Sequence, residues 1–130
     1  MDRKNYTTGA KWESIVGYSR AVRIGNTIEV SGSVPLRDGE IVGLGDAYLQ
    51  AKRSLEIVVE SIENLGGQKE DIIRTRMYVT NIKDWEAVGK AHGECFAGIQ
   101  PATSMIEVSG LIAPEFLIEI EATAIIEKAD

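Results

Sequence analysis

The apolar positions along this chain repeat with a period of two in some segments and of three to four in others. The two kinds of segment alternate along the sequence. Alternation with a period of two is typical of half-buried strands. It predicts five strands, at 20–24, 27–34, 71–80, 103–109 and 116–126. Gly25 and Asn26 separate the first two strands, and because both residue types tolerate the backbone of a tight turn, we predict a β-hairpin there.

Two helices are predicted in the segments between these strands. Asp46 is a candidate N-cap for the first, whose apolar residues recur every three or four positions and which ends at Gly66 and Gly67. Asp84 precedes the second, whose predicted buried stripe comprises Trp85, Val88, His92, Cys95 and Phe96. Pro101 prevents this helix from continuing, because proline lacks the backbone N–H that a helix interior needs.

The number of helices limits how the sheet is covered. Two helices can cover one face of a sheet of five or six strands, but not both. The pattern therefore predicts an α+β fold with a mixed sheet of about six strands and both helices on one face. An uncovered face that mixes polar and apolar side chains suits an assembly interface with a polar pocket better than it suits bare solvent.

The polar residues of the last two strands are the candidates for that pocket. The apolar residues Ile118 and Ile120 are predicted to face the helices, so Glu119 and Glu121 should face the uncovered side. Three residues of the preceding strand, Thr103, Met105 and Glu107, also alternate. We expect these three residues on the uncovered side as well, beside the two acids.

Composition and charge exclude several classes of protein. A chain of 130 residues, 44% of them hydrophobic, is the size of one domain over residues 1–130, and no segment approaches the roughly 18 apolar residues of a membrane span. The N-terminal residues lack an apolar signal-peptide core, so we expect a cytoplasmic protein without membrane contact. A net charge of -6 disfavours nucleic acid as a partner. With one cysteine and one histidine, we expect no disulfide, no metal site and no cofactor.

Several short motifs resemble the RidA/YjgF family when taken in order over residues 15–127. They are GYSRAV, VSGSVP, RTRMYVT, a helix of the form W-x-x-V-x-x-x-H-x-x-x-F, PATSMIEV and IEIEATA. The resemblance implies a chorismate-mutase-like fold and a homotrimer with small-molecule clefts between subunits. Active members hydrolyse reactive 2-imino acids, or their enamine tautomers, to 2-keto acids and ammonia. The labels "translation initiation inhibitor" and "endoribonuclease" also belong to this family.

The resemblance implies a site, and this chain departs from it at one important position. Active members have an arginine in a P-A-R-S stretch that binds the substrate carboxylate, and here Thr103 stands in its place. A guanidinium offers a carboxylate two parallel charged hydrogen bonds, whereas a hydroxyl offers one neutral donor. Met105 likewise replaces a cysteine of the family and Gly89 an asparagine. Residues that match the family are Tyr18, Ser31, Gly32 and Glu119, the last matching the acid thought to position or activate the hydrolytic water.

Each candidate also has a structural interpretation. Glu119 is the candidate catalytic residue, but paired acids on a sheet are often solvated or ion-paired, here with Arg74 or Arg76. His92 could act as an acid or base, yet its place in the apolar stripe favours a packed, hydrogen-bonded histidine. Tyr18 could orient a ligand or pack at an interface. The other candidates for lining the cleft are Trp12, which either covers it or pins the N-terminus, and Gly89.

Three functions follow from these residues. The first is an enzyme that hydrolyses an imine, an enamine or a related C–N compound other than the usual 2-imino acids. The second is a trimer that binds a small metabolite without turning it over, and the third is an RNA-cleaving or translation-inhibiting protein. For the first two we expect a neutral or weakly cationic ligand, oriented by the hydroxyls of Thr103 and Tyr18. The competing view is that Arg20, Arg74 or Arg76 replaces the missing arginine.

Overall fold

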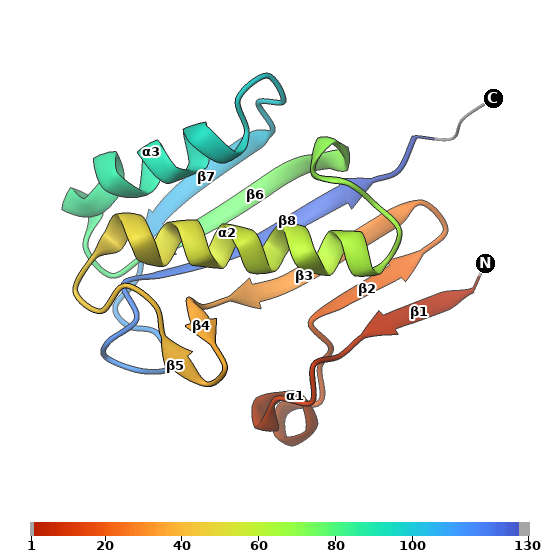
Figure 1. The fold of residues 1–130 in the computed structure, drawn as a ribbon, viewed down its shortest axis with the longest axis horizontal. Coiled ribbons are helices and arrows are strands. Elements are labelled where there is room, and N and C mark those ends of the chain that lie inside the picture. The colour runs from red at the N-terminus through yellow and green to blue at the C-terminus, as the bar shows by residue number, and fades with distance from the viewer. Residues whose placement is uncertain (1, 128–130) are drawn as a thin grey trace.

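A mixed sheet of six strands forms the centre of the molecule in the computed structural model, which describes residues 2–127 (Figure 1). The strand order is β1-β2-β3-β8-β6-β7, with β6 and β7 parallel and the other neighbours antiparallel. The strands are β1 (Arg3–Tyr6), β2 (Ala21–Ile24), β3 (Thr27–Ser33), β6 (Ile72–Val79), β7 (Ala102–Glu107) and β8 (Ile118–Ile125). Outside this sheet, β4 (Leu36–Arg37) pairs with β5 (Glu40–Ile41) in a short hairpin.

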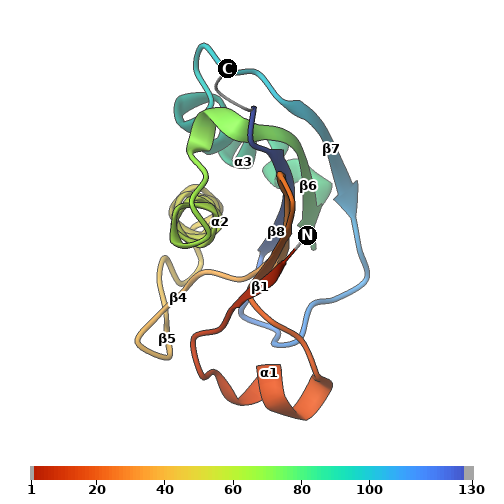
Figure 2. The same ribbon diagram turned by 90° about the vertical axis from the view of Figure 1, so that its right-hand side faces the viewer.

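Two helices, α2 (Ala47–Asn64) and α3 (Trp85–Cys95), lie on the same face of the sheet, as Figure 2 shows edge-on. We call this the covered face and the opposite one the open face. As predicted, Asp46 caps α2, its side chain accepting a hydrogen bond from the Leu49 backbone N–H at 3.0 Å. The remaining helical segments are α1 (Lys11–Val16), beyond the ends of the first strands, and two 3-10 turns, η1 (Lys69–Asp71) and η2 (Ile82–Asp84). No helix within residues 2–127 is long and apolar enough to cross a membrane.

The core lies between the covered face and these two helices. In β8 the side chains of Ile118, Ile120, Ala122 and Ala124 are all buried, which confirms the predicted apolar row of the last strand. Strand β3 contributes Ile28 and Val30, and α2 buries an apolar stripe against them. The hairpin turn between β2 and β3 is also confirmed, with Gly25 at a φ of 60°.

Three short elements and one side chain differ from the prediction. Strand β1 supplies the sixth strand, and it was missed because its residues are polar and mostly exposed, so they show no alternation. The hairpin β4–β5 and helix α1 are too short for a periodic pattern. Trp85 does not join the buried stripe of α3, since its side chain is 57% exposed. Trp85 is the first residue of α3, and burial begins one turn later, at Val88.

The expected placement of β7 was wrong. The parallel register pairs Thr103 with Thr75 and Met105 with Met77, and paired residues of neighbouring strands point to the same face. Because Thr75 and Met77 are buried beneath the helices, Thr103 and Met105 belong to the covered face, together with Glu107. The alternate residues of β7 share the open face with Glu119. The sequence of β7 could not show this, because polar and apolar residues are mixed in both of its rows.

Candidate functional site

A β-bulge brings the first group of candidate residues together on the open face. Strands β3 and β8 lose their regular register between Val30 and Ser33, where Ser31 and Gly32 lie. The Ser31 backbone N–H donates to the Arg20 carbonyl at 2.9 Å, and its hydroxyl donates to the Ser19 carbonyl at 2.6 Å. Bulges re-aim side chains and are frequent beside active sites. This bulge fixes Ser31 and Gly32 next to the segment that carries Tyr18.

Gly32 and Glu119 are in close contact across this bulge. A Cβ atom on Gly32 would lie 2.7 Å from Cδ of Glu119 and still closer to its Oε2. The carboxyl group is the end of a flexible side chain, so a larger residue at position 32 would turn it out of the place that it occupies. Two of the residues that match the family are therefore in contact, although the sequence did not predict this.

Burial changes the electrostatics of Glu119. Its side chain is partly withdrawn from solvent, which raises the pKa of the carboxyl above its usual value; nearby Arg20 lowers this pKa, and Glu121 raises it again. Arg20 donates hydrogen bonds to the Gly32 carbonyl at 2.7 Å and to Ser33 Oγ at 3.3 Å. A carboxylate that holds its proton more tightly than usual is a better general base toward water. Glu119 thus combines restricted position with raised basicity.

The neighbouring acid, Glu121, accepts a hydrogen bond from a tyrosine. The Tyr78 hydroxyl donates to Glu121 Oε1 at 2.5 Å, and this bond is the main cause of the raised pKa of Tyr78. Ion pairs of Glu119 or Glu121 with Arg74 or Arg76, the alternative considered from the sequence, are absent within 4.0 Å in the described chain. Arg74 instead donates to Ser104 Oγ at 2.7 Å, on the open face.

A hollow of about 400 Å³ opens beside this group. Tyr18 and Ser31 line it, and so do Arg3 and Asn5 of β1, which were not foreseen because β1 itself was not. The Arg20 guanidinium lies 5.5 Å from the centre of the Tyr18 ring. The walls supplied by α1 are Glu13 and Ser14, whereas Trp12 of the same helix packs beneath Lys11, whose Nζ is 4.7 Å from the ring centre. The hollow therefore offers hydroxyl and charged groups on one side of Tyr18.

The second group of candidates lies on the covered face, at the edge of the sheet. Thr103 is exposed on β7, and its hydroxyl accepts a hydrogen bond from Thr75 Oγ1 at 2.7 Å. Thr75 is fully buried and lies 2.8 Å from His92 Nε2. Met105 packs partly against the core. Gly89, on α3, has open space where a side chain would be.

The two groups are separated by the sheet. Tyr18, Ser31, Gly32 and Glu119 lie on or beside the open face, whereas Thr103, Met105 and His92 lie on the covered face. Arg74 and Arg76 belong to the open face too, paired in register with Thr123 and Glu121. Neither arginine replaces the missing guanidinium at Thr103 within one chain.

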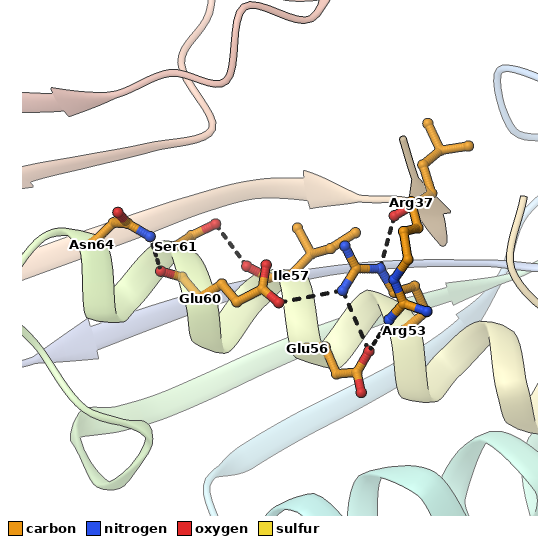
Figure 3. Close-up of polar contacts among 8 residues, drawn as sticks. Arg37, Arg53, Glu56, Ile57, Glu60, Ser61 and Asn64 are labelled. Atoms are coloured by element: carbon orange, nitrogen blue, oxygen red, sulfur yellow. Dashed lines mark hydrogen bonds and ion pairs between the residues drawn. The ribbon is translucent and has the colours of Figure 1, made fainter. Parts of the chain in front are cut away.

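The ion pairs of the described chain lie elsewhere, on the outer side of α2 (Figure 3). Arg53 bridges Glu56 and Glu60 and also donates to the Leu36 carbonyl at 2.8 Å, which ties β4 to α2. A hollow of about 540 Å³ adjoins these residues and Cys95. It is larger than the hollow beside Tyr18, but Arg53 and the two glutamates on its wall are already paired with one another, so we assign them a structural role. Three or more metal-ligating side chains do not gather anywhere in residues 2–127.

Comparisons with known proteins support the resemblance. A family model described as "Endoribonuclease L-PSP" matches residues 8–126. A protein of Acinetobacter baylyi named 3-aminoacrylate deaminase RutC is 32% identical over 108 residues, covering 82% of this chain and 85% of that protein. A Mycobacterium tuberculosis structure, described as a member of the YjgF/YER057c/UK114 family, matches with a TM-score of 0.88 and 41% identity, over 96% of this chain and 100% of the other. The YjgF gene product of E. coli matches with a TM-score of 0.82 and 31% identity, over 94% and 98% of the two chains.

The contact between Gly32 and Glu119 predicts that the stability of the protein depends on the size of the side chain at position 32. Gly32→Ala should lower the free energy of unfolding by about 0.5 to 1.5 kcal/mol, because the new methyl group must turn the flexible end of the Glu119 side chain out of its place. Gly93→Ala is the matched control: Gly93 lies on α3 with open space around it, and alanine there should stabilise the helix by roughly 0.5 to 1 kcal/mol. Urea unfolding of both variants at one protein concentration measures the difference. Equal stability of Gly32→Ala and the unmodified protein would show that the contact is not tight.

The raised pKa of Glu119 predicts a dependence of stability on pH. The folded state binds this proton more tightly than the unfolded state does, so its contribution to stability is complete below the unfolded pKa, about 4.3, and is lost as the pH rises through the folded pKa. Glu119→Gln carries no such proton. Its Tm relative to the unmodified protein should therefore increase between pH 4 and pH 7, measured by calorimetry in matched buffers. A difference that stays constant or decreases would contradict the raised pKa.

Proposed function

The chain belongs to the endoribonuclease L-PSP family, which is the RidA/YjgF family. We propose that it hydrolyses a small imine, or the tautomeric enamine, and that this substrate does not need a carboxylate to bind. Glu119 carries this proposal, because it is a partly buried carboxylate of raised pKa in contact with Gly32, and the preceding residue, Ser31, lines the same hollow as Tyr18. The relative named 3-aminoacrylate deaminase supports the reaction class, since deamination removes nitrogen from carbon.

The proposed reaction uses Glu119 as a general base. Its carboxylate accepts a proton from water as the water oxygen attacks the imine carbon, and the imine nitrogen gains a proton, which gives a carbinolamine. Glu119 first delivers the water proton to the imine nitrogen. It then takes the hydroxyl proton of the intermediate and passes that proton to the nitrogen as well, so that the C–N bond breaks, ammonia or an amine leaves, the carbon becomes a carbonyl, and the carboxylate is regenerated. General-base catalysis of this kind contributes typically 10²- to 10⁴-fold in rate.

The substrate class follows from Thr103. Charged hydrogen bonds contribute about 1.5 to 3 kcal/mol, so exchanging a guanidinium for one hydroxyl predicts at least a tenfold weaker hold on a carboxylate. Arg20 is close enough to Glu119 to lower its pKa, but two of its N–H groups already bond Gly32 and Ser33. Met105 adds a flexible apolar wall where the family has a cysteine. These features favour a neutral or weakly cationic ligand with an apolar portion.

The assembly we propose is a homotrimer with the clefts between its subunits. Glu119 and Thr103 lie on opposite faces of one sheet, so a small ligand that contacts both must bind between two chains. The open face also presents Thr123 and Ile125 among its acids, with Ile125 45% exposed, whereas Leu117, predicted on this face, packs against the core. A threefold arrangement, implied by the family resemblance, would place the open face of one subunit against the β7 edge of the next.

A binding protein without catalysis is the second candidate function. It is favoured by Met105 and Gly89, two departures from the family that leave Thr103 without the polar neighbours of active members. Turnover of any imine with loss on Glu119→Gln would exclude it. The family description as an endoribonuclease makes RNA cleavage a third candidate, and the net charge of -6 disfavours it.

The proposed assembly predicts a mass three times that of the chain, 14.2 kDa, in light scattering at micromolar concentration. Glu121→Arg should weaken the trimer, because it places a third cation beside Arg74 and Arg76 on the face that the trimer would bury. Glu63→Arg on the exposed side of α2 is the matched control and should leave the mass unchanged. A monomer for the unmodified protein would contradict the proposal.

The missing arginine predicts the activity toward 2-imino acids. The unmodified protein should hydrolyse 2-imino acids formed in situ from serine or threonine poorly, and Thr103→Arg should raise kcat/KM at least tenfold by restoring two charged hydrogen bonds to the carboxylate. Thr103→Lys is the matched control, because it restores the charge without the paired donors. Ammonia release measures both.

Two outcomes would count against this account. Efficient hydrolysis of 2-imino acids by the unmodified protein would show that the arginine is not needed. Activity of Thr103→Arg that survives the additional change Glu119→Gln would show that Glu119 is not the base.

A further inference from the structure

Three hydrogen-bonding side chains connect the buried core to the exposed edge of the sheet. His92 Nε2 lies 2.8 Å from Thr75 Oγ1, and Thr75 Oγ1 lies 2.7 Å from Thr103 Oγ1. His92 is 9% exposed and Thr75 is 0% exposed, whereas Thr103 is exposed. Of these three residues, only Thr103 enters the proposed function, so the presence of two buried polar groups behind it needs an explanation.

Packing alone does not explain Thr75. Its neighbours along the covered face of β6 are Met77 and Val79, both apolar and buried, and a valine would have the same shape as threonine. A buried hydroxyl without partners is costly, so Thr75 is tolerated because His92 and Thr103 satisfy it. His92 lies in the same core, against Phe96 at a ring-centre distance of 4.6 Å, and burial lowers its pKa. The imidazole is therefore neutral near pH 7, with one N–H and one free nitrogen.

Neutral His92 gives the chain of hydrogen bonds a direction. The Thr75 hydroxyl has one proton, so it donates either to Thr103 or to His92, but not to both. If Nε2 of His92 carries the ring proton, it donates to Thr75, Thr75 donates to Thr103, and the Thr103 proton is free to point outward. If Nδ1 carries the proton, every bond reverses and Thr103 turns a lone pair outward. The two distances of 2.8 and 2.7 Å suit either arrangement, and only the first leaves Thr103 with an outward donor.

We propose that His92, Thr75 and Thr103 act as one relay, in which His92 fixes the Thr103 hydroxyl as an outward hydrogen-bond donor toward a neutral acceptor of the ligand, a carbonyl oxygen or an imine nitrogen. The relay rests on the proposed function only in placing a ligand at Thr103. His92 and Thr75 are positioning residues, since both act on the ligand through Thr103. At position 103, where active members of the family have an arginine, the relay thus supplies an uncharged hydrogen-bond donor of fixed direction.

The relay can be tested by NMR in the absence of a substrate, from the tautomer of His92. His92 is the only histidine of the chain, so its ring nitrogens give the only imidazole signals in a ¹⁵N NMR spectrum of the protein. The unmodified protein should show the tautomer protonated at Nε2. Thr103→Val removes the acceptor of the Thr75 hydroxyl, which should then donate to His92 and shift the ring to the tautomer protonated at Nδ1.

Two further variants separate the relay from general effects on the fold. Thr103→Ser keeps the hydroxyl and should keep the original tautomer. Ser61→Ala removes a different buried hydroxyl, one that bonds the Ile57 carbonyl of its own helix at 2.7 Å, and should leave His92 unchanged. Unchanged ring signals in Thr103→Val, or an Nδ1-protonated ring in the unmodified protein, would overturn the relay. These outcomes do not depend on whether any imine is hydrolysed.

A pair of simple probes tests the ligand class. N,N-dimethylacetamide offers only an acceptor and ethylammonium only donors. At saturating concentration the amide should shift the His92 signals of the unmodified protein, but not those of Thr75→Val, in which the relay is cut. Ethylammonium should shift neither. A response to ethylammonium, or none to the amide, would overturn the assignment of Thr103 as an outward donor.

Discussion

The pairing of strand β6 with its two neighbours fixes the face to which the side chains of the candidate site belong, and the arrangement of that site depends on this. Strand β6 pairs with β8 on one side and with β7 on the other, so one row of its residues sets the direction of three strands. That row includes Thr75, Met77 and Val79, all buried beneath α2 and α3. A shift of the pairing between β6 and β8 by one residue would expose the apolar row of β8 and bury its acids. The register is therefore held by the hydrophobic effect over the whole covered face.

This register also places the two groups of candidate site residues on opposite faces of the sheet. Glu119 is opposite Tyr78 in the register and Thr103 is opposite Thr75, and Tyr78 and Thr75 point to different sides of β6. A single chain thus presents a carboxylate on one side and a hydroxyl on the other. In the proposed trimer each face would supply half of a cleft, and activity would require association. Loss of activity on dilution would then report dissociation of subunits rather than unfolding.

The sequence predicted those elements whose side chains repeat regularly. The long helix from Ala47 to Asn64 and the apolar row of β8 have clear periods, so burial determined their structure. Gly32 and Glu119 became candidates only through the family resemblance, and their contact was not predicted, because a bulge is a local departure from any period. The side of Thr103 could not be predicted, since an edge strand with two mixed rows takes its direction from its partner. Arg3 and Asn5 gave no signal because a short polar strand is indistinguishable from a loop.

The polar character of β1 has a consequence for association between molecules. This strand forms one edge of the sheet, and its exposed residues Arg3 and Lys4 place two positive charges along that edge. Beneath it, β2 has the sequence AVRI, which is short, mainly apolar and able to pair on its free side. Unprotected edges of that kind recruit strands from other chains, and charged residues oppose such recruitment. The two charges of β1 thereby oppose the addition of a strand from another molecule at this edge of the sheet.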